Sequence, residues 1–149
     1  METDFAPIDF GTSPDASFPI ETLMVIEDNS VDQMICRRII KRSGMVRKLY
    51  PFVYANDALD FLKTKDRPVI DAILLDINMP RMDGFEFLEA ATRQLGDNFA
   101  RMVVVMLTTS LDPRDAKRAE NFSVVREYFN KPLVLEHLER ISAHLRAMA

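Results

Sequence analysis

Acidic, hydroxyl and basic side chains each come at or just beyond the end of a short apolar run in this 149-residue chain; they are Glu27, Asp28, Asp76, Thr108 and Lys131. Carboxylate oxygens suit a hard cation such as Mg²⁺, an ammonium attracts phosphate oxygens, and a threonine hydroxyl can donate a further hydrogen bond. Three carboxylates in one pocket would repel each other unless a cation lies among them or some stay protonated. An aspartate in such a pocket can attack phosphorus and form an aspartyl phosphate.

Each of these residues also has an ordinary structural explanation when it is taken alone. An acid after a strand is often a helix cap, and the Glu27–Asp28 pair is favourable charge before a helix N-terminus. Thr108 could simply end a strand, and Lys131–Pro132 is a common loop dipeptide. Their joint occurrence at four strand ends is what favours a shared site.

The positions of these residues depend on a regular alternation of strands and helices over residues 22–149. The predicted strands are 23–26, 49–54, 69–77, 102–107 and about 127–129, and a predicted helix follows each of them. This alternation predicts an α/β fold with a doubly wound, five-stranded parallel sheet of flavodoxin-like topology and strand order 2-1-3-4-5. Ligands of such sheets bind at the carboxyl ends of the strands. Pro51 removes a ladder donor, so the second strand is expected at a sheet edge.

The first predicted helix begins at Asn29 or Ser30 and ends at Gly44, and its inward positions are expected near Val31, Ile35 and Ile39.

Residues 1–21 differ in composition from the rest, with three prolines and no sustained period. We interpret them as a flexible N-terminal extension. Four apolar residues in it could instead dock on the domain or on a partner: Phe5, Ile8, Phe10 and Phe18. Residues 22–149 are then the single folded domain.

The bulk composition excludes several classes of protein. A hydrophobic content of 48% supports one apolar core, while the net charge of −4 argues against a nucleic-acid partner. The single cysteine, Cys36, fits a reducing compartment. No run approaches the roughly 18 apolar residues of a membrane helix, and the acidic N-terminus does not resemble a secretory signal. We therefore expect a soluble, cytoplasmic protein.

Four segments resemble the receiver domain of two-component response regulators. They read LMVIEDN at 23–29, AILLDINMPRMDGFEFL at 72–88, VVVMLTTS at 103–110 and YFNKPL at 128–133. Their order and spacing are similar to those of the family over roughly residues 23–147.

The resemblance implies a metal-dependent phosphoacceptor site. Asp76 would accept the phosphoryl group, with Mg²⁺ as the cofactor. Asp28 would bind Mg²⁺ directly, Glu27 largely through water, and Asn78 through its backbone carbonyl.

The resemblance also implies a switch. Thr108 would hydrogen-bond the phosphoryl group and move toward it, Lys131 would pair with a phosphoryl oxygen, and the Tyr128 ring would turn inward as Thr108 shifts. The bond between Lys131 and Pro132 would be cis.

The implied partner is a histidine kinase or a histidine phosphotransfer protein. Docking is expected on the exposed surface of the first helix, formed by Met34, Arg37, Arg38, Lys41 and Arg42; a solvated basic face is the alternative. Phosphorylation would change the shape of the face made by the fourth helix, the fifth strand and the fifth helix, which could then bind a target protein or form a homodimer. Alternatively, the phosphoryl group would be relayed to another protein. No output domain follows the fifth helix, so a single-domain regulator is expected.

Beside a receiver, three functions are open to a chain of this fold: a phosphatase, a flavin-binding protein and an interaction module. We expect Mg²⁺-dependent self-phosphorylation and slow self-dephosphorylation but no turnover of a separate substrate. An aspartate-nucleophile phosphatase needs a second acid two residues after the nucleophile, where this chain has Asn78. A flavin site would find its phosphate repelled by Glu27 and Asp28. A receiver-like interaction module that works without phosphorylation remains the alternative.

Overall fold

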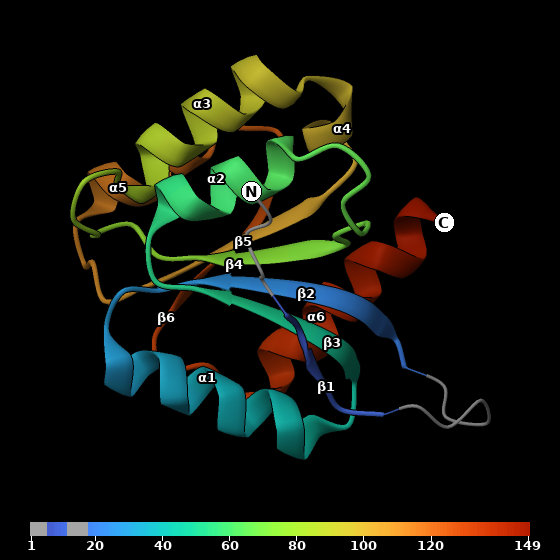
Figure 1. The fold of residues 1–149 in the computed structure, drawn as a ribbon. Helices are drawn as coiled ribbons and strands as arrows, with labels where there is room; N and C mark the ends of the chain where they lie inside the picture. The colour runs from blue at the N-terminus through green and yellow to red at the C-terminus, as the bar shows by residue number, and fades with distance from the viewer. Residues whose placement is uncertain (1–5, 12–17) are drawn as a thin grey trace.

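The computed structural model describes residues 6–11 and 18–149. Six strands of these residues form one sheet in the order β1-β3-β2-β4-β5-β6 (Figure 1). The strands are β1 (Ile8–Asp9), β2 (Ile20–Ile26), β3 (Val46–Phe52), β4 (Ala72–Leu75), β5 (Val103–Thr108) and β6 (Val125–Asn130). Neighbouring strands from β3 to β6 are parallel. The α/β prediction is therefore confirmed.

Helices cover both faces of this sheet. They are α1 (Ser30–Ser43), α2 (Ala55–Lys63), α3 (Gly84–Leu95), α4 (Asp97–Ala100), α5 (Pro113–Ala119) and α6 (Leu135–Met148). Helices α2 to α5 lie on one face, and α1 and α6 lie on the other (Figure 1). Two apolar clusters result, one beneath each layer of helices. The central strands read as continuous apolar runs because both of their faces are covered. None of the described helices is both long and apolar enough to cross a membrane.

The prediction of a purely parallel, five-stranded sheet was wrong at one edge. The order 2-1-3-4-5 describes β2 to β6, but β1 adds a sixth strand that pairs antiparallel with β3, Ile8 opposite Leu49 and Asp9 opposite Lys48. A strand of two residues has no period that a sequence pattern can reveal. Pro51 lies beyond this short pairing, so its missing N–H removes no hydrogen bond with β1.

The predicted flexible extension is described only in part. Residues 1–5 and 12–17 lie outside the described residues. Of the remainder, Ile8 and Phe10 pack against the cluster beneath α1 and α6, and Ile20 is the first residue of β2.

Helix α1 begins and ends as predicted, but of its predicted inward positions Ile35 and Ile39 are only partly buried and Val31 is exposed. The Asn29 side chain caps its first turn, and Gly44 ends it in the left-handed conformation with φ 63°. The buried residues are Gln33, Cys36 and Ile40, whereas Val31 is 54% exposed. Two apolar stripes with helical spacing overlap in this segment, and only packing against the sheet selects between them.

Candidate functional site

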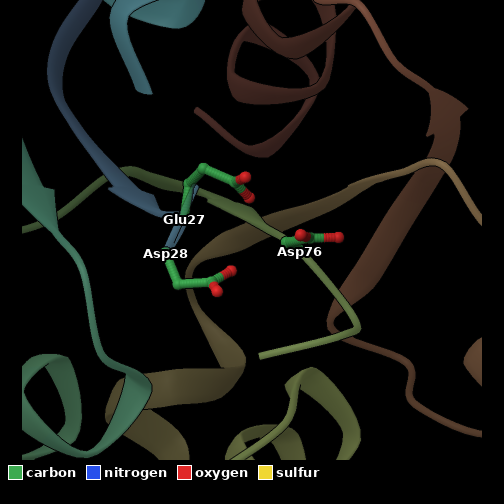
Figure 2. Close-up of side chains that lie close together, drawn as sticks. All are labelled: Glu27, Asp28 and Asp76. Carbon is green, nitrogen blue, oxygen red and sulfur yellow. The ribbon is translucent and has the colours of Figure 1, made fainter. Parts of the chain in front are cut away.

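The carboxyl ends of four neighbouring strands bring the predicted site residues together. Glu27 and Asp28 follow β2, Asp76 follows β4, Thr108 ends β5, and Lys131 follows β6. Glu27, Asp28 and Asp76 each offer a carboxylate oxygen, and these atoms lie within 4.8 Å of one another. Figure 2 shows these three side chains at the adjoining ends of their two segments. We call them the carboxylate cluster.

Lys131 joins this cluster through its ammonium group. Its Nζ donates to Glu27 Oε1 at 2.8 Å and to Asp76 Oδ2 at 3.0 Å. A third bond, at 2.9 Å, goes to Asp32 Oδ2 in the first turn of α1. Asp32 was not among the predicted site residues. Its only signal in the sequence is an acid four residues after Asp28, on the helix that follows the first predicted strand.

The carboxylate cluster is largely buried, and the single ammonium of Lys131 does not balance its negative charge. Burial and then the neighbouring Asp76 side chain raise the pKa of Glu27 to about 8, and Lys131 opposes this only in part. Burial lowers the pKa of Lys131, but its hydrogen bonds with carboxylates raise that pKa above the ordinary value. Glu27 Oε2 is buried and has no hydrogen-bond partner among the described residues. An oxygen-only donor set with an unpartnered buried oxygen fits a divalent cation.

The Asp76 backbone is held at a close approach to α3. Ile77 N donates to Asp76 Oδ1 at 2.7 Å, and Gly84 N donates to Ile77 O at 2.8 Å. A Cβ at Gly84 would clash with the backbone carbonyl oxygen of Asp76. Glycine is therefore required where α3 begins for a steric reason.

Thr108 and Tyr128 lie on neighbouring strands beside the cluster. Thr108 is fully buried, and its Oγ1 accepts a hydrogen bond from Ser110 N at 3.1 Å. The Tyr128 hydroxyl is buried and makes no hydrogen bond with any described residue. Burial raises the pKa of Tyr128. The Lys131–Pro132 bond is cis, as the resemblance implied, and Lys131 N donates to Thr108 O at 2.9 Å.

Gln33 is a second residue near the site that the sequence did not predict. Its buried side-chain Nε2 donates to the carbonyl oxygens of Glu27 at 3.1 Å and Phe52 at 3.0 Å. It thereby holds the ends of β2 and β3 against α1. A polar residue on the buried face of a helix is the signal that could have found it.

Other predicted residues lie at the margin of the site or away from it. The Asn78 side chain is exposed, two residues after Asp76. The predicted docking residues on α1 are all exposed: Met34, Arg37, Arg38, Lys41 and Arg42.

Comparison with known proteins gives a consistent result. A family model described as "Response regulator receiver domain" matches residues 23–143. The chain is 31% identical to the probable methanogenesis regulatory protein FilR2 of Methanothrix harundinacea, over 89% of this chain and 85% of that protein. It is 32% identical to response regulator Rcp1 of Synechocystis, over 68% of this chain and 70% of that protein. Other curated relatives are much longer, and the chain spans 14% and 7% of two of them.

Solved structures agree in fold. A two-component response regulator from Cytophaga hutchinsonii has a TM-score of 0.77 at 25% identity, covering 86% of this chain and 98% of that one. The Mn²⁺-bound form of response regulator Rcp1 has a TM-score of 0.66 at 25% identity, covering 85% of this chain and 92% of that one.

Proposed function

Because the chain belongs to the family of response regulator receiver domains, we propose that Asp76 accepts a phosphoryl group from a phosphohistidine of a partner protein. The observation that carries this proposal is the convergence of the carboxylate cluster and the Lys131 ammonium in one pocket. The family is a signalling module, so no turnover of a separate substrate is proposed.

The transfer chemistry uses both oxygens of Asp76. One carboxylate oxygen attacks phosphorus while the phosphorus–nitrogen bond breaks, and the electron pair of that bond stays on the histidine ring. Ile77 N and Lys131 Nζ each contact one oxygen of Asp76, which orients the carboxylate before attack. Lys131 then offsets charge on a phosphoryl oxygen.

Glu27, Asp28 and Asp76, with the backbone carbonyl of Asn78, would hold Mg²⁺, which supplies charge neutralisation for the phosphoryl oxygens when bound. The unpartnered Glu27 Oε2 supports this assignment. The Mn²⁺-bound form of Rcp1 supports a divalent cation in a receiver of similar fold.

The signal would leave the site through Thr108 and Tyr128. The added phosphoryl group carries up to two negative charges and offers acceptors to the Thr108 hydroxyl. Tyr128 lies on β6, the strand that pairs with the β5 strand of Thr108, so its ring would follow a shift of Thr108. The face formed by α5, β6 and α6 would change shape as a result.

Receiver domains interact with histidine kinases or phosphotransfer proteins. For this chain we propose docking on α1 through its exposed basic residues and a cytoplasmic location. We also propose that the domain switches a target, forms a homodimer through the α5, β6 and α6 face, or relays the phosphoryl group.

The test is incubation of the protein with acetyl phosphate and Mg²⁺, followed by intact-mass measurement. We expect one added phosphoryl group on the wild type and none on Asp76→Asn. Asp60→Asn is the matched control, because Asp60 is exposed on α2 and pairs only with Lys63 among the described residues. An unmodified wild type would favour the phosphorylation-independent module instead. An equally modified Asp76→Asn would show that another residue accepts the phosphoryl group, and would overturn the assignment to Asp76.

A further inference from the structure

Lys131 lies between two buried acids and one acid at the rim of the site. Its Nζ is 2.8 Å from Glu27 Oε1, 3.0 Å from Asp76 Oδ2 and 2.9 Å from Asp32 Oδ2. The Asp32 side chain is 30% exposed, compared with 4% for that of Glu27. Glu27 and Asp76 belong to the carboxylate cluster, whereas Asp32 does not.

These three contacts occupy the whole donor capacity of the lysine. An ammonium has three N–H donors and no acceptor. Two of its acceptors have a second task in the proposed function, because Glu27 and Asp76 would also bind the cation. Glu27 Oε2 can bind a cation without losing a contact to Lys131. At Asp76, however, Oδ1 already accepts from Ile77 N and Oδ2 from Lys131, so a cation there draws on oxygens that are in use. Asp32 has no such second task.

We propose that Asp32 is a positioning residue that retains the Lys131 ammonium when Glu27 and Asp76 bind a divalent cation. The inference rests on the proposed function of the site and extends it to Asp32. The Lys131 side chain is only 10% exposed, and a buried charge without a partner is costly. Without Asp32, the ammonium stays on Glu27 and Asp76 and competes with the cation for their oxygens.

A simpler role for Asp32 makes a different prediction. An acid in the first turn of α1 interacts favourably with the helix dipole. That role affects the stability of the fold, and its effect does not depend on Lys131. The two roles therefore differ in whether the effect of removing Asp32 requires the lysine.

A double-mutant cycle on Mg²⁺ affinity separates the positioning role of Asp32 from a role that does not involve Lys131. Titration calorimetry without any phosphoryl donor would measure the dissociation constant of wild type, Asp32→Asn, Lys131→Met and the double variant at constant ionic strength. Asp32→Asn is expected to weaken Mg²⁺ binding about fivefold in the wild-type background and less than about twofold in the Lys131→Met background. Equal effects in both backgrounds would mean that Asp32 acts only as a nearby charge, and would overturn the proposal.

Two further variants control for charge and folding. Asp60→Asn makes the same change in net charge away from the site and should keep wild-type affinity. Asp32→Glu keeps the carboxylate and should bind Mg²⁺ within about twofold of the wild type; affinity as low as that of Asp32→Asn would contradict the proposal. Melting curves of each variant would verify that it is folded.

The outcomes also separate this inference from the proposed function. A wild type that accepts a phosphoryl group but shows no coupling between Asp32 and Lys131 overturns the inference alone. A wild type that shows the coupling but accepts no phosphoryl group overturns phosphoacceptance alone. A wild type that binds no Mg²⁺ overturns the role of Asp32 and the proposed cation together.

Discussion

Strands β2 and β4 carry a polar cluster at each of their two ends. The two clusters differ in whether their charged and polar groups have partners. At the amino ends, Thr22 N and Thr22 Oγ1 both contact Asp71 Oδ2, at 3.1 and 3.0 Å. Asp71 is the one acid of this Thr22–Asp71 pair, and the buried side-chain atoms of the two residues all have partners within the described part of the chain. At the carboxyl ends, the Lys131 ammonium contacts Glu27, Asp32 and Asp76, and Asp28 adds a fourth carboxylate beside them. Glu27 Oε2 has no partner among the described residues.

This difference separates stabilising polar groups from ligand-binding ones. A satisfied cluster ties strand ends together. The single proton of the Thr22 hydroxyl has two acceptors within reach, Val69 O at 2.6 Å and Asp71 Oδ2, and Asp71 N donates back to Thr22 Oγ1 at 3.2 Å. A cluster with excess like charge opposes folding until a ligand supplies the missing charge. Departures from local satisfaction are expected at functional sites, so the carboxyl ends are where the function should lie.

The largest effect on stability is expected where the carboxyl-end cluster meets α3. Gly84→Ala would place a Cβ against the Asp76 carbonyl oxygen and should cost about 3 kcal/mol of unfolding free energy, measured by urea denaturation, with loss of phosphorylation. Gly44→Ala is the control: its φ is 63° but no atom lies within 4 Å of the added Cβ, so a cost of about 1 kcal/mol is expected. Equal costs would contradict the steric explanation.

Asp71→Ala tests the satisfied cluster. It removes the acceptor of Thr22 N and should lower the unfolding free energy by roughly 2 kcal/mol. Phosphorylation by acetyl phosphate should keep its wild-type rate, because Asp71 lies at the other end of the sheet. A slower rate in the folded variant would show that the two ends are not independent.

Mg²⁺ should stabilise the protein only through the carboxyl-end cluster. At ten times its dissociation constant, a ligand of the native state adds about 1.4 kcal/mol, which thermal unfolding with Mg²⁺ or with a chelator would measure. Asp28→Asn should lose this gain, whereas Asp71→Ala should keep it. A gain of the same size in Asp28→Asn would place the cation elsewhere.

Asp76→Asn should change the unfolding free energy in the opposite direction to Asp71→Ala. Removing one charge from the crowded cluster relieves repulsion while Lys131 keeps Glu27 and Asp32 as partners. Without Mg²⁺, the variant should be about 0.5–1 kcal/mol more stable than wild type in urea denaturation. A loss of stability would show that the Asp76–Lys131 contact outweighs the repulsion.

The smallest effect on stability is expected from residues in neither cluster. Arg37→Glu with Arg38→Glu changes exposed positions on α1 and should alter stability by less than about 0.5 kcal/mol. Phosphotransfer from a partner kinase should nevertheless slow, while modification by acetyl phosphate stays unchanged. Unchanged transfer would remove α1 as the docking surface.

The sequence was most informative where the fold is regular. Apolar runs long enough to be buried strands predicted β2, β4 and β5, and the carboxyl ends of parallel strands necessarily meet at one edge. Glu27, Asp28, Asp76 and Lys131 could therefore be assigned to one pocket without coordinates. The same reasoning does not reach β1, because two residues are too few to show a period.

The helical contributions to the site were harder to predict. Asp32 and Gln33 reach it only because α1 turns Gln33, Cys36 and Ile40 toward the sheet rather than Val31. Both choices satisfy the same helical spacing. Which face of α1 lies against the sheet is therefore decided by packing.

The sequence by itself determined the type of fold, the order of strands and helices and the chemical groups near the strand ends, because alternation and residue type are local properties. Only the tertiary structure decided which groups share the Lys131 ammonium and which buried oxygen has no partner. Those outcomes depend on how α1 and β6 pack beside β2 and β4, and packing sums many contacts between residues far apart in the chain.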